Sequence, residues 1–433
     1  MKKNHIDLIT LGCSKNLVDT EKLMYQLRLA GYTVSHDAEK PNGEIIVINT
    51  CGFIGDAKEE SINMILSFAE KKQKRQLKKL FVMGCLSQRY LQELSVEIPE
   101  VDKFYGKFNY NELLKELGKE YRSDCSVQRD ITTPMHYSYV KISEGCNRAC
   151  SYCAIPIITG RYQSREIEDI EEEVKWLVTQ GVKEFQLIAQ DLSYYGLDNY
   201  KELKLAELTE RIADIEGVEW LRLHYLYPTS FPIDVLKVMR ERDNVCKYLD
   251  IALQHISDPM LKKMRRGITS EQTYELLRMI REQVPGIHIR TTMLLGHPGE
   301  TEEDVEALKK FIQEMRFERL GAFAYSDEED TYSNKHYTDD IPFEVKQQRV
   351  DEIMEIQQTI SLEHNEAKIG KQYKIIIDSL QGDYYVARTE YDSPEVDMEV
   401  LIKKEESELV IGNFYTAQVI AAEEFDLYAH IIK

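Results

Sequence analysis

The sequence lacks the features that would place the protein in a membrane or outside the cell. No run of eighteen apolar residues occurs, and the first residues have no apolar core of a secretory signal peptide. We therefore expect a cytoplasmic protein that does not bind a membrane. In that reducing compartment, the eight cysteines are expected to be metal ligands or buried thiols rather than disulfides.

Basic residues are scarce relative to acidic ones. The chain has 55 Lys and Arg against 75 Asp and Glu, which gives a formal net charge of −20. Such a surface repels phosphate backbones on average and attracts basic partners, although a local basic patch can override it. Solubility alone would explain the same charge.

The densest cysteine motif is followed by about seventy residues without another Cys or His. Cys146, Cys150 and Cys153 form a C-x3-C-x2-C loop, and the next Cys or His along the chain is His224. A structural zinc site would need a fourth ligand, and a disulfide with a spare thiol is disfavoured in a reducing compartment. Three thiolates can instead hold three irons of a cubane cluster, which leaves the fourth iron open for chemistry.

Three more cysteines follow apolar runs in residues 1–123, where short apolar runs alternate with helical patterns as in a parallel α/β sheet. Cys13, Cys51 and Cys85 each come directly after such a run. The carboxyl ends of parallel strands meet along one edge of a sheet, where open α/β folds bind ligands. We therefore expect these thiols to converge on a site, although three buried small side chains remain the alternative.

The strand and helix alternation starts again after a polar linker around Cys125 and continues through residues 132–367. Six βα units predict a partial barrel with its working loops at the carboxyl ends of the strands, and the Cys146 loop follows the first strand. A long charged helix is expected at the end of this section. The predicted strands are Tyr137–Ile142, Glu184–Ala189, Trp220–Tyr225, Tyr248–Leu253, His288–Leu295 and Arg319–Tyr325.

Residues 368–433 alternate as short strands with turns, which predicts a small antiparallel β-barrel. Small barrels of this kind often bind RNA, but acidic residues outnumber basic ones here. Glu395, Asp397 and Glu399 alternate along a predicted strand, so we expect them to share one exposed face that could dock a basic protein.

The C-x3-C-x2-C loop, with the aromatic Tyr152 before its last Cys, resembles the signature of radical S-adenosylmethionine (SAM) enzymes. The resemblance implies that SAM binds the open iron, that the backbone of Tyr152 lies beside the adenine, and that cleavage of SAM yields a 5′-deoxyadenosyl radical. The segment Gly296-His-Pro-Gly-Glu300 also resembles a loop near the SAM in this superfamily. We assign no catalytic role to any histidine side chain.

Over essentially its whole length the chain resembles the methylthiotransferases, with an N-terminal sheet, a TIM-like radical SAM barrel and a TRAM-like β-barrel. This resemblance implies that Cys13, Cys51 and Cys85 hold a second [4Fe-4S] cluster beside that of Cys146, Cys150 and Cys153. It also implies two SAM in separate roles and an external electron donor such as flavodoxin or ferredoxin.

Within this family, the segments around Cys13 and Cys146 are similar to the RimO branch, which adds a methylthio group to the β-carbon of an aspartate in ribosomal protein S12. A basic ribosomal protein suits an acidic enzyme. The alternatives are a MiaB-like enzyme that modifies an adenosine in transfer RNA and a non-catalytic iron–sulfur protein. In the stretches Ala189-Gln-Asp191 and Ile157-Ile-Thr-Gly160 the chain departs from the family pattern.

Overall fold

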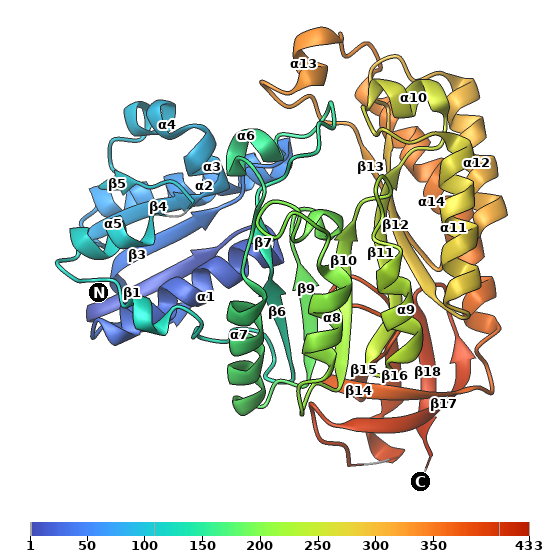
Figure 1. Ribbon diagram of the computed structural model, residues 1–433. Helices are drawn as coiled ribbons and strands as arrows, with labels where there is room; N and C mark the ends of the chain where they lie inside the picture. The colour runs from blue at the N-terminus through green and yellow to red at the C-terminus, as the bar shows by residue number, and fades with distance from the viewer. Residues whose placement is uncertain (1, 108, 407, 433) are drawn as a thin grey trace.

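The computed structural model describes residues 2–107, 109–406 and 408–432, and Figure 1 shows three layered units in chain order. The N-terminal unit is a parallel sheet with strand order β2-β1-β3-β4-β5. Its central strands are the three predicted apolar runs, and the short strands β2 and β5 were not predicted. The strands are β1 (Lys2–Thr10), β2 (Thr33–His36), β3 (Gly43–Thr50), β4 (Lys79–Gly84) and β5 (Lys103–Phe104), and the helices are α1 (Ser14–Leu29), α2 (Gly55–Gln73), α3 (Cys85–Arg89), α4 (Leu91–Glu97) and α5 (Tyr110–Glu116).

The middle unit is a parallel six-stranded sheet with order β13-β12-β11-β10-β9-β6, so β13 and β6 are its two edges. All six predicted strands are confirmed within one to three residues. The long strands are β6 (Tyr137–Lys141), β9 (Glu184–Ile188), β10 (Trp220–Leu226), β11 (Val245–Gln254), β12 (His288–Leu295) and β13 (Arg319–Ala324), with a short pair β7 (Ser143–Glu144) and β8 (Gln163–Ser164) before the first crossover helix.

Crossover helices cover the outer face of this sheet (Figure 1), and their apolar stripes form the largest core of the molecule. Thr269 and Thr301 start two of these helices with reciprocal capping boxes. The helices are α6 (Ile155–Thr159), α7 (Ile167–Thr179), α8 (Leu205–Ala213), α9 (Asp234–Glu241), α10 (Asp258–Lys263), α11 (Ser270–Gln283), α12 (Glu302–Met315), α13 (Tyr332–His336) and α14 (Phe343–Glu366).

The C-terminal unit is a closed barrel with order β14-β15-β16-β18-β17. Its neighbouring strands are antiparallel except β16 and β18, which run parallel. A hairpin turn at Gln381–Asp383 joins the first two strands. The strands are β14 (Gln372–Gln381), β15 (Tyr384–Thr389), β16 (Glu399–Lys403), β17 (Phe414–Ala422) and β18 (Asp426–Ile431).

The predicted acidic face of this barrel is wrong. Only Glu399 lies in a strand, whereas Glu395 and Asp397 belong to the preceding loop. Glu395 accepts hydrogen bonds from the hydroxyls of Tyr137 and Tyr139. The Asp397 side chain is 1% exposed and pairs with Arg290. The two carboxylates fasten the barrel to the sheet, because hydrophobic alternation cannot distinguish a strand from an extended loop that docks.

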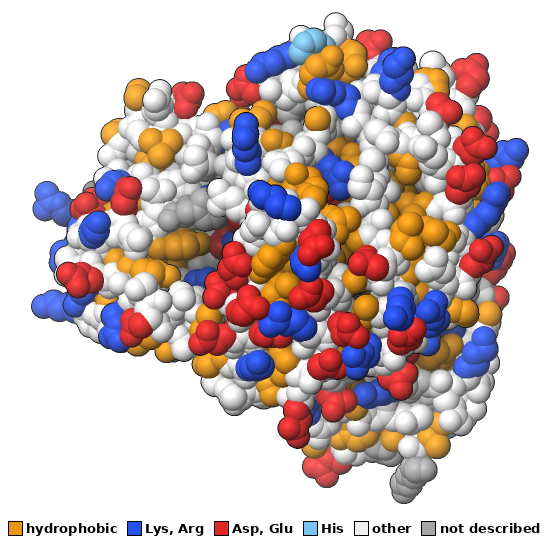
Figure 2. Space-filling view, in the orientation of Figure 1, with side chains coloured by type: hydrophobic (Ala, Val, Ile, Leu, Met, Phe, Trp, Pro, Cys, Tyr) orange, Lys and Arg blue, Asp and Glu red, His pale blue; other side chains and the backbone are white. Residues whose placement is uncertain are grey.

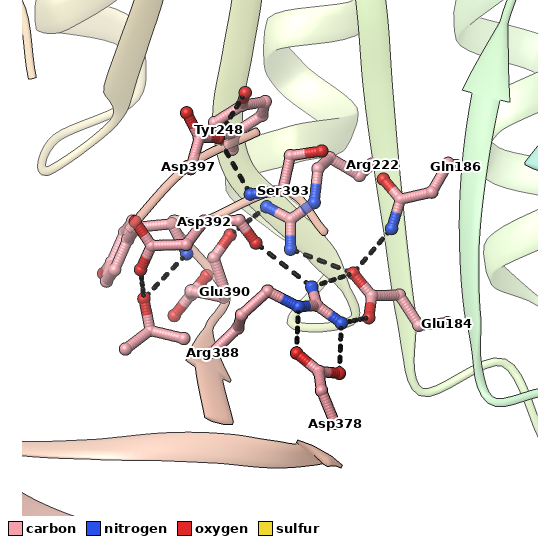
Figure 3. Close-up of polar contacts among 12 residues, drawn as sticks. Glu184, Gln186, Arg222, Tyr248, Asp378, Arg388, Glu390, Asp392, Ser393 and Asp397 are labelled. Carbon is pink, nitrogen blue, oxygen red and sulfur yellow. Dashed lines mark hydrogen bonds and ion pairs between the residues drawn. The ribbon is translucent and has the colours of Figure 1, made fainter. Parts of the chain in front are cut away.

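The C-terminal barrel closes the amino-terminal end of the six-stranded sheet through buried ion pairs (Figure 3). Arg388, on β15, binds both Glu184 at the start of β9 and Asp378 on β14. Arg222, on β10, contacts the same Glu184 at 3.1 Å. The opposite, carboxyl-terminal end of the sheet therefore stays available for a site.

Buried ion pairs also fix the N-terminal sheet against the middle unit. Arg129, in the predicted linker, is fully buried and pairs with Glu21 on α1 and Glu173 on α7. Lys141 on β6 binds Asp19, and Lys107 binds Glu144 at 2.8 Å. The linker is thus an ordered part of the interface, and it sets how the two sheets face each other.

Candidate active site

Cys13, Cys51 and Cys85 directly follow β1, β3 and β4, three neighbouring strands of the N-terminal sheet. Gly12 makes room for this approach, because a Cβ atom there would lie 2.9 Å from the Cys51 Sγ, and its φ of +93° favours glycine. The structure thus brings the three thiols to one sheet edge, as predicted.

Asn16, in the first turn of α1, organises the loops that carry these cysteines. Its side-chain amide donates to the carbonyls of Leu11 and Thr50 at 3.0 and 3.1 Å. The Cys85 thiol lies 3.6 Å from the Asn16 Oδ1. Sequence reasoning missed this residue, since a single Asn near a helix start normally indicates only a cap.

The electrostatic surroundings of the three thiols differ. Burial raises the pKa of Cys85 to about 12 and also raises the pKa of Cys51. Burial raises the pKa of Cys13 as well, but the Lys15 charge and the backbone amide of Asn16 outweigh it, so this pKa is lowered. Iron binds thiolates, so occupation of this site would release protons from the buried pair.

Cys146, Cys150 and Cys153 lie in the loop between β7 and α6. The backbone amide of Arg148 donates to the Cys146 Sγ at 3.4 Å, and the Arg266 guanidinium donates to the Cys150 Sγ at 3.2 Å. Burial raises the pKa of Cys146 to about 12 and raises that of Cys153 further. Donors aimed at sulfur suit a loop that carries thiolates.

Neighbouring loops hold the Cys146 loop in place. Arg148 binds Asp191 at 2.7 Å, and the Ser151 amide donates to the Met264 carbonyl at 3.0 Å. A Cβ on Gly145, whose φ is +79°, would lie 2.2 Å from the Arg161 carbonyl oxygen. Asp191 belongs to a stretch that departs from the family pattern, yet its carboxylate still anchors the loop.

The donor chemistry, three thiols in each set, fits an iron–sulfur cluster. Among the described residues, no three Cys, His, Asp or Glu side chains are arranged to hold one metal ion. A cubane needs a looser arrangement, because each of its irons takes its own ligand. The other two thiols lie elsewhere: Cys246 is buried beside Trp220, and Cys125 is half-buried in the linker.

The two cysteine sets lie on either side of one interface. Helix α3, which begins at Cys85, packs against α6, which begins two residues after Cys153. Cys85 itself shares a small buried cluster with Ala154 and Ile158. Figure 1 shows α3 and α6 side by side between the two sheets. Sequence alone placed each set at a strand end and left their separation undetermined.

A cavity of about 740 Å³ opens next to this interface, at the carboxyl ends of β12 and β13. Tyr152 lines it from the cysteine loop, and Arg266 donates to the Tyr152 hydroxyl at 3.2 Å. Residues 53–56 of the N-terminal unit form another wall, so both units enclose the space. Its polar lining includes the ion pair between Lys346 and Asp339.

The Gly296–Glu300 loop lies beside the cavity and is held by hydrogen bonds and an ion pair. The Gly296 amide donates to Glu300 at 2.8 Å, and Glu300 pairs with Arg349 at 2.9 Å. His297 binds the hydroxyls of Ser151 and Ser333, and burial lowers its pKa to about 4. These hydrogen bonds tie the Gly296–Glu300 loop to the Cys146 loop and to α13.

None of the helices in the described part of the chain is both long and apolar enough to cross a membrane. On the face shown in Figure 2, basic and acidic side chains are intermixed, and no continuous basic area is visible.

Three family models match the chain in succession. They are the uncharacterized protein family UPF0004 over residues 5–106, the radical SAM superfamily over residues 140–312 and the TRAM domain over residues 369–432. Among solved structures, the radical SAM methyltransferase TsrM from Kitasatospora setae superposes with a TM-score of 0.53 at 18% identity, covering 74% of this chain and 72% of that chain. That likeness shows the fold.

Curated relatives match from end to end. The ribosomal protein uS12 methylthiotransferase RimO of Bacteroides thetaiotaomicron is 66% identical over 433 residues, covering 100% of this chain and 99% of the relative. The protein of the same name in Flavobacterium johnsoniae is 53% identical, covering 99% and 98%. At such identity and coverage, the chain belongs to the RimO family of methylthiotransferases, within the radical SAM superfamily.

Proposed function

We propose that this enzyme adds a methylthio group to the β-carbon of an aspartate in ribosomal protein S12. The observation that carries the proposal is the pair of cysteine sets that face each other across α3 and α6, beside a cavity enclosed by both units. The names of the full-length relatives supply the substrate. Their shared architecture supplies the reaction class.

We infer that Cys146, Cys150 and Cys153 hold one [4Fe-4S] cluster and that Cys13, Cys51 and Cys85 hold a second. When bound, these groups supply the electron that cleaves SAM and a place for the sulfur that is transferred. We assign the second cluster to residues 1–123, the radical SAM core to residues 132–367 and the TRAM-like barrel to residues 368–433.

The protein's own residues position and shield the reacting groups. Arg266 bridges the Cys150 thiol and the Tyr152 hydroxyl, so it orients the loop that contacts SAM. The cavity walls keep water from a radical that would otherwise be quenched. Because the two cysteine sets are fixed by the same interface, transfer from one to the other is intramolecular and needs no second encounter.

The partners are a basic ribosomal protein and an external electron donor of the flavodoxin or ferredoxin kind, and the reaction takes place in the cytoplasm. Transfer RNA is the alternative substrate. The net charge of −20 and the intermixed charges in Figure 2 favour the protein substrate.

Mass spectrometry of ribosomal proteins and transfer RNA, from cells with and without this gene, tests the proposal. A methylthio group that disappears from S12 in the deletion strain supports it. Loss of methylthio adenosine from transfer RNA, with S12 unchanged, would assign the enzyme to the other substrate.

A further inference from the structure

Strand β13 leaves one side of its backbone unpaired. The Tyr325 amide donates to the Leu295 carbonyl of β12 at 2.8 Å, so by alternation the odd-numbered residues face β12. The amides and carbonyls of Leu320, Ala322 and Ala324 therefore point away from the sheet. In the described ranges, no hydrogen bond to these outward groups is found. A free edge of this kind is a template for another strand.

Two cavities lie along this edge, and consecutive residues of β13 line them. The first, of about 400 Å³, is lined by Arg319, Leu320 and Gly321, next to the C-terminal barrel. The second is the 740 Å³ cavity, which Ala322, Phe323 and Ala324 line. The strand thus connects the barrel to the cavity beside Tyr152, over about 20 Å for six residues.

Large apolar side chains are exposed in the two cavities at the ends of β13. Phe323 and Phe343 line the larger cavity and are 57% and 66% exposed. Val396 and Phe425 line the smaller one and are 56% and 54% exposed. Four such residues gathered along one strand indicate a surface that another chain covers.

The smaller cavity, next to the C-terminal barrel, carries uncompensated negative charge. Arg290 and Arg319 are paired with Asp397 and Asp392. Glu399, Glu424 and Asp426 also line the smaller cavity, and no ion pair to them is found within the described part of the chain. A basic side chain would complement this end.

We propose that an extended segment of the basic protein substrate docks as an added strand on the free edge of β13. Its target aspartate enters the cavity beside Tyr152, and a Lys or Arg about five residues away reaches Glu399 and Asp426. The proposal rests on the proposed function and adds the mode of substrate binding. An RNA strand has no backbone donors and acceptors that match a strand edge, and it would meet like charge at the barrel end.

A backbone-methylated peptide series tests the added strand without altering the enzyme. The probe is a synthetic S12 peptide that spans the target aspartate, with one amide N-methylated at a time, bound to reconstituted, SAM-loaded enzyme. We expect losses of about tenfold at alternate positions only, because every second amide faces β13. A flat or uniform profile would overturn the added strand.

Enzyme variants give the complementary test. Ala322→Pro removes an outward amide without breaking a bond to β12, and Ala322→Ser retains that amide, so only the former should weaken peptide binding. Glu399→Lys should weaken binding and its salt dependence, whereas Asp383→Lys, an exposed acid in the β14–β15 hairpin, should not. Equal binding by both members of either pair contradicts the model.

The possible results of these experiments distinguish a failure of the docking model from a failure of the proposed function. If the native enzyme methylthiolates the peptide but the N-methyl profile is flat, the docking model fails and the function stands. If the native enzyme leaves S12 unmodified and modifies transfer RNA, the proposed function fails and the docking model with it.

Discussion

The two cysteine sets differ in the side chains that contact them. Both sets contain three thiols, but only the Cys146 set is contacted by the Arg266 guanidinium and lies on the loop of Tyr152. The Cys13 set instead surrounds Asn16 and the start of α1. This asymmetry predicts separate roles that substitutions can resolve.

Changing Cys146, Cys150 and Cys153 to Ala should reduce the iron content from about eight to about four per chain and abolish SAM cleavage. Changing Cys13, Cys51 and Cys85 to Ala should also leave about four irons, but with SAM cleavage retained and methylthiolation lost. Iron analysis and 5′-deoxyadenosine assays check both. Production of 5′-deoxyadenosine by the first variant would disprove the assignment.

Arg266 should tune the group held by the Cys146 set. Its Nη1 donates to the Cys150 sulfur, and hydrogen bonds to ligand sulfur raise a reduction potential. Arg266→Lys replaces the planar guanidinium, with its several N–H donors, by a single ammonium group. We therefore expect a lower reduction potential of the bound cluster and slower SAM cleavage. A redox titration followed by electron paramagnetic resonance measures the potential. Arg265→Lys is the matched control, because Arg265 stacks on Tyr332 instead; an equal shift in both variants would refute the role.

Among the elements, β15 contacts the start of β9 through a buried ion pair between Arg388 and Glu184. Burial raises the pKa of Glu184, but the charges and hydrogen bonds of Arg388 and Arg222 outweigh it and lower this pKa to about 2. The ordinary value is 4.5. Ionised Glu184 therefore stabilises the fold fully above pH 4.5, and this contribution is lost as the pH falls from 4.5 toward 2.

Glu184→Gln should destabilise the protein by about 3–5 kcal/mol at pH 7, since the buried Arg222 loses its carboxylate partner and Arg388 keeps only Asp378. The variant should also lose the part of the acid dependence that Glu184 contributes. Thermal unfolding at pH 7 and pH 4 measures both effects. Glu171→Gln is a suitable control, because that carboxylate pairs with Arg211 at the surface. Equal losses in the two variants would contradict a special role for the interface.

At the scale of the whole molecule, the C-terminal barrel is a separate domain that also stabilises the six-stranded sheet. It covers Trp220 and Tyr248, which are 3% and 0% exposed, and it neutralises charges inside the sheet. The same packing holds loop 390–398 at the amino-terminal end of the six strands. The barrel thereby contributes a wall of the smaller cavity.

A chain truncated after residue 367 should therefore be unstable or aggregated rather than a free-standing catalytic core. Its Trp220 and Tyr248 would meet solvent, Arg222 would lose its hydrogen bond to the Glu390 carbonyl, and Arg319 would lose its ion pair with Asp392. Size-exclusion chromatography and thermal unfolding check this. A monomeric truncated chain with an unchanged unfolding temperature would show that the barrel is dispensable for folding.

Local patterns in the sequence were enough for the elements and for the six cysteines as a candidate set. The long strands of both parallel sheets are short segments rich in apolar residues, and Cys13, Cys51, Cys85 and the Cys146 loop each come soon after such a strand. Periodicity and turn residues act over a few positions, so a single sequence displays them. Because parallel strands have their carboxyl ends at one edge of the sheet, residues that follow different strands can be predicted to lie near each other before any long-range contact is known.

The tertiary structure alone decided how these pieces meet. The facing of α3 and α6, the hydrogen bonds from Arg266 to the Cys150 loop, and the burial of Asp397 each join residues about 70 or more positions apart. Local propensity does not encode such partners, because the energy of a buried contact depends on which surfaces the whole fold brings together. For the same reason the pattern at Glu395–Glu399 suggested an exposed strand, whereas packing against Tyr137, Tyr139 and Arg290 made it a docking loop.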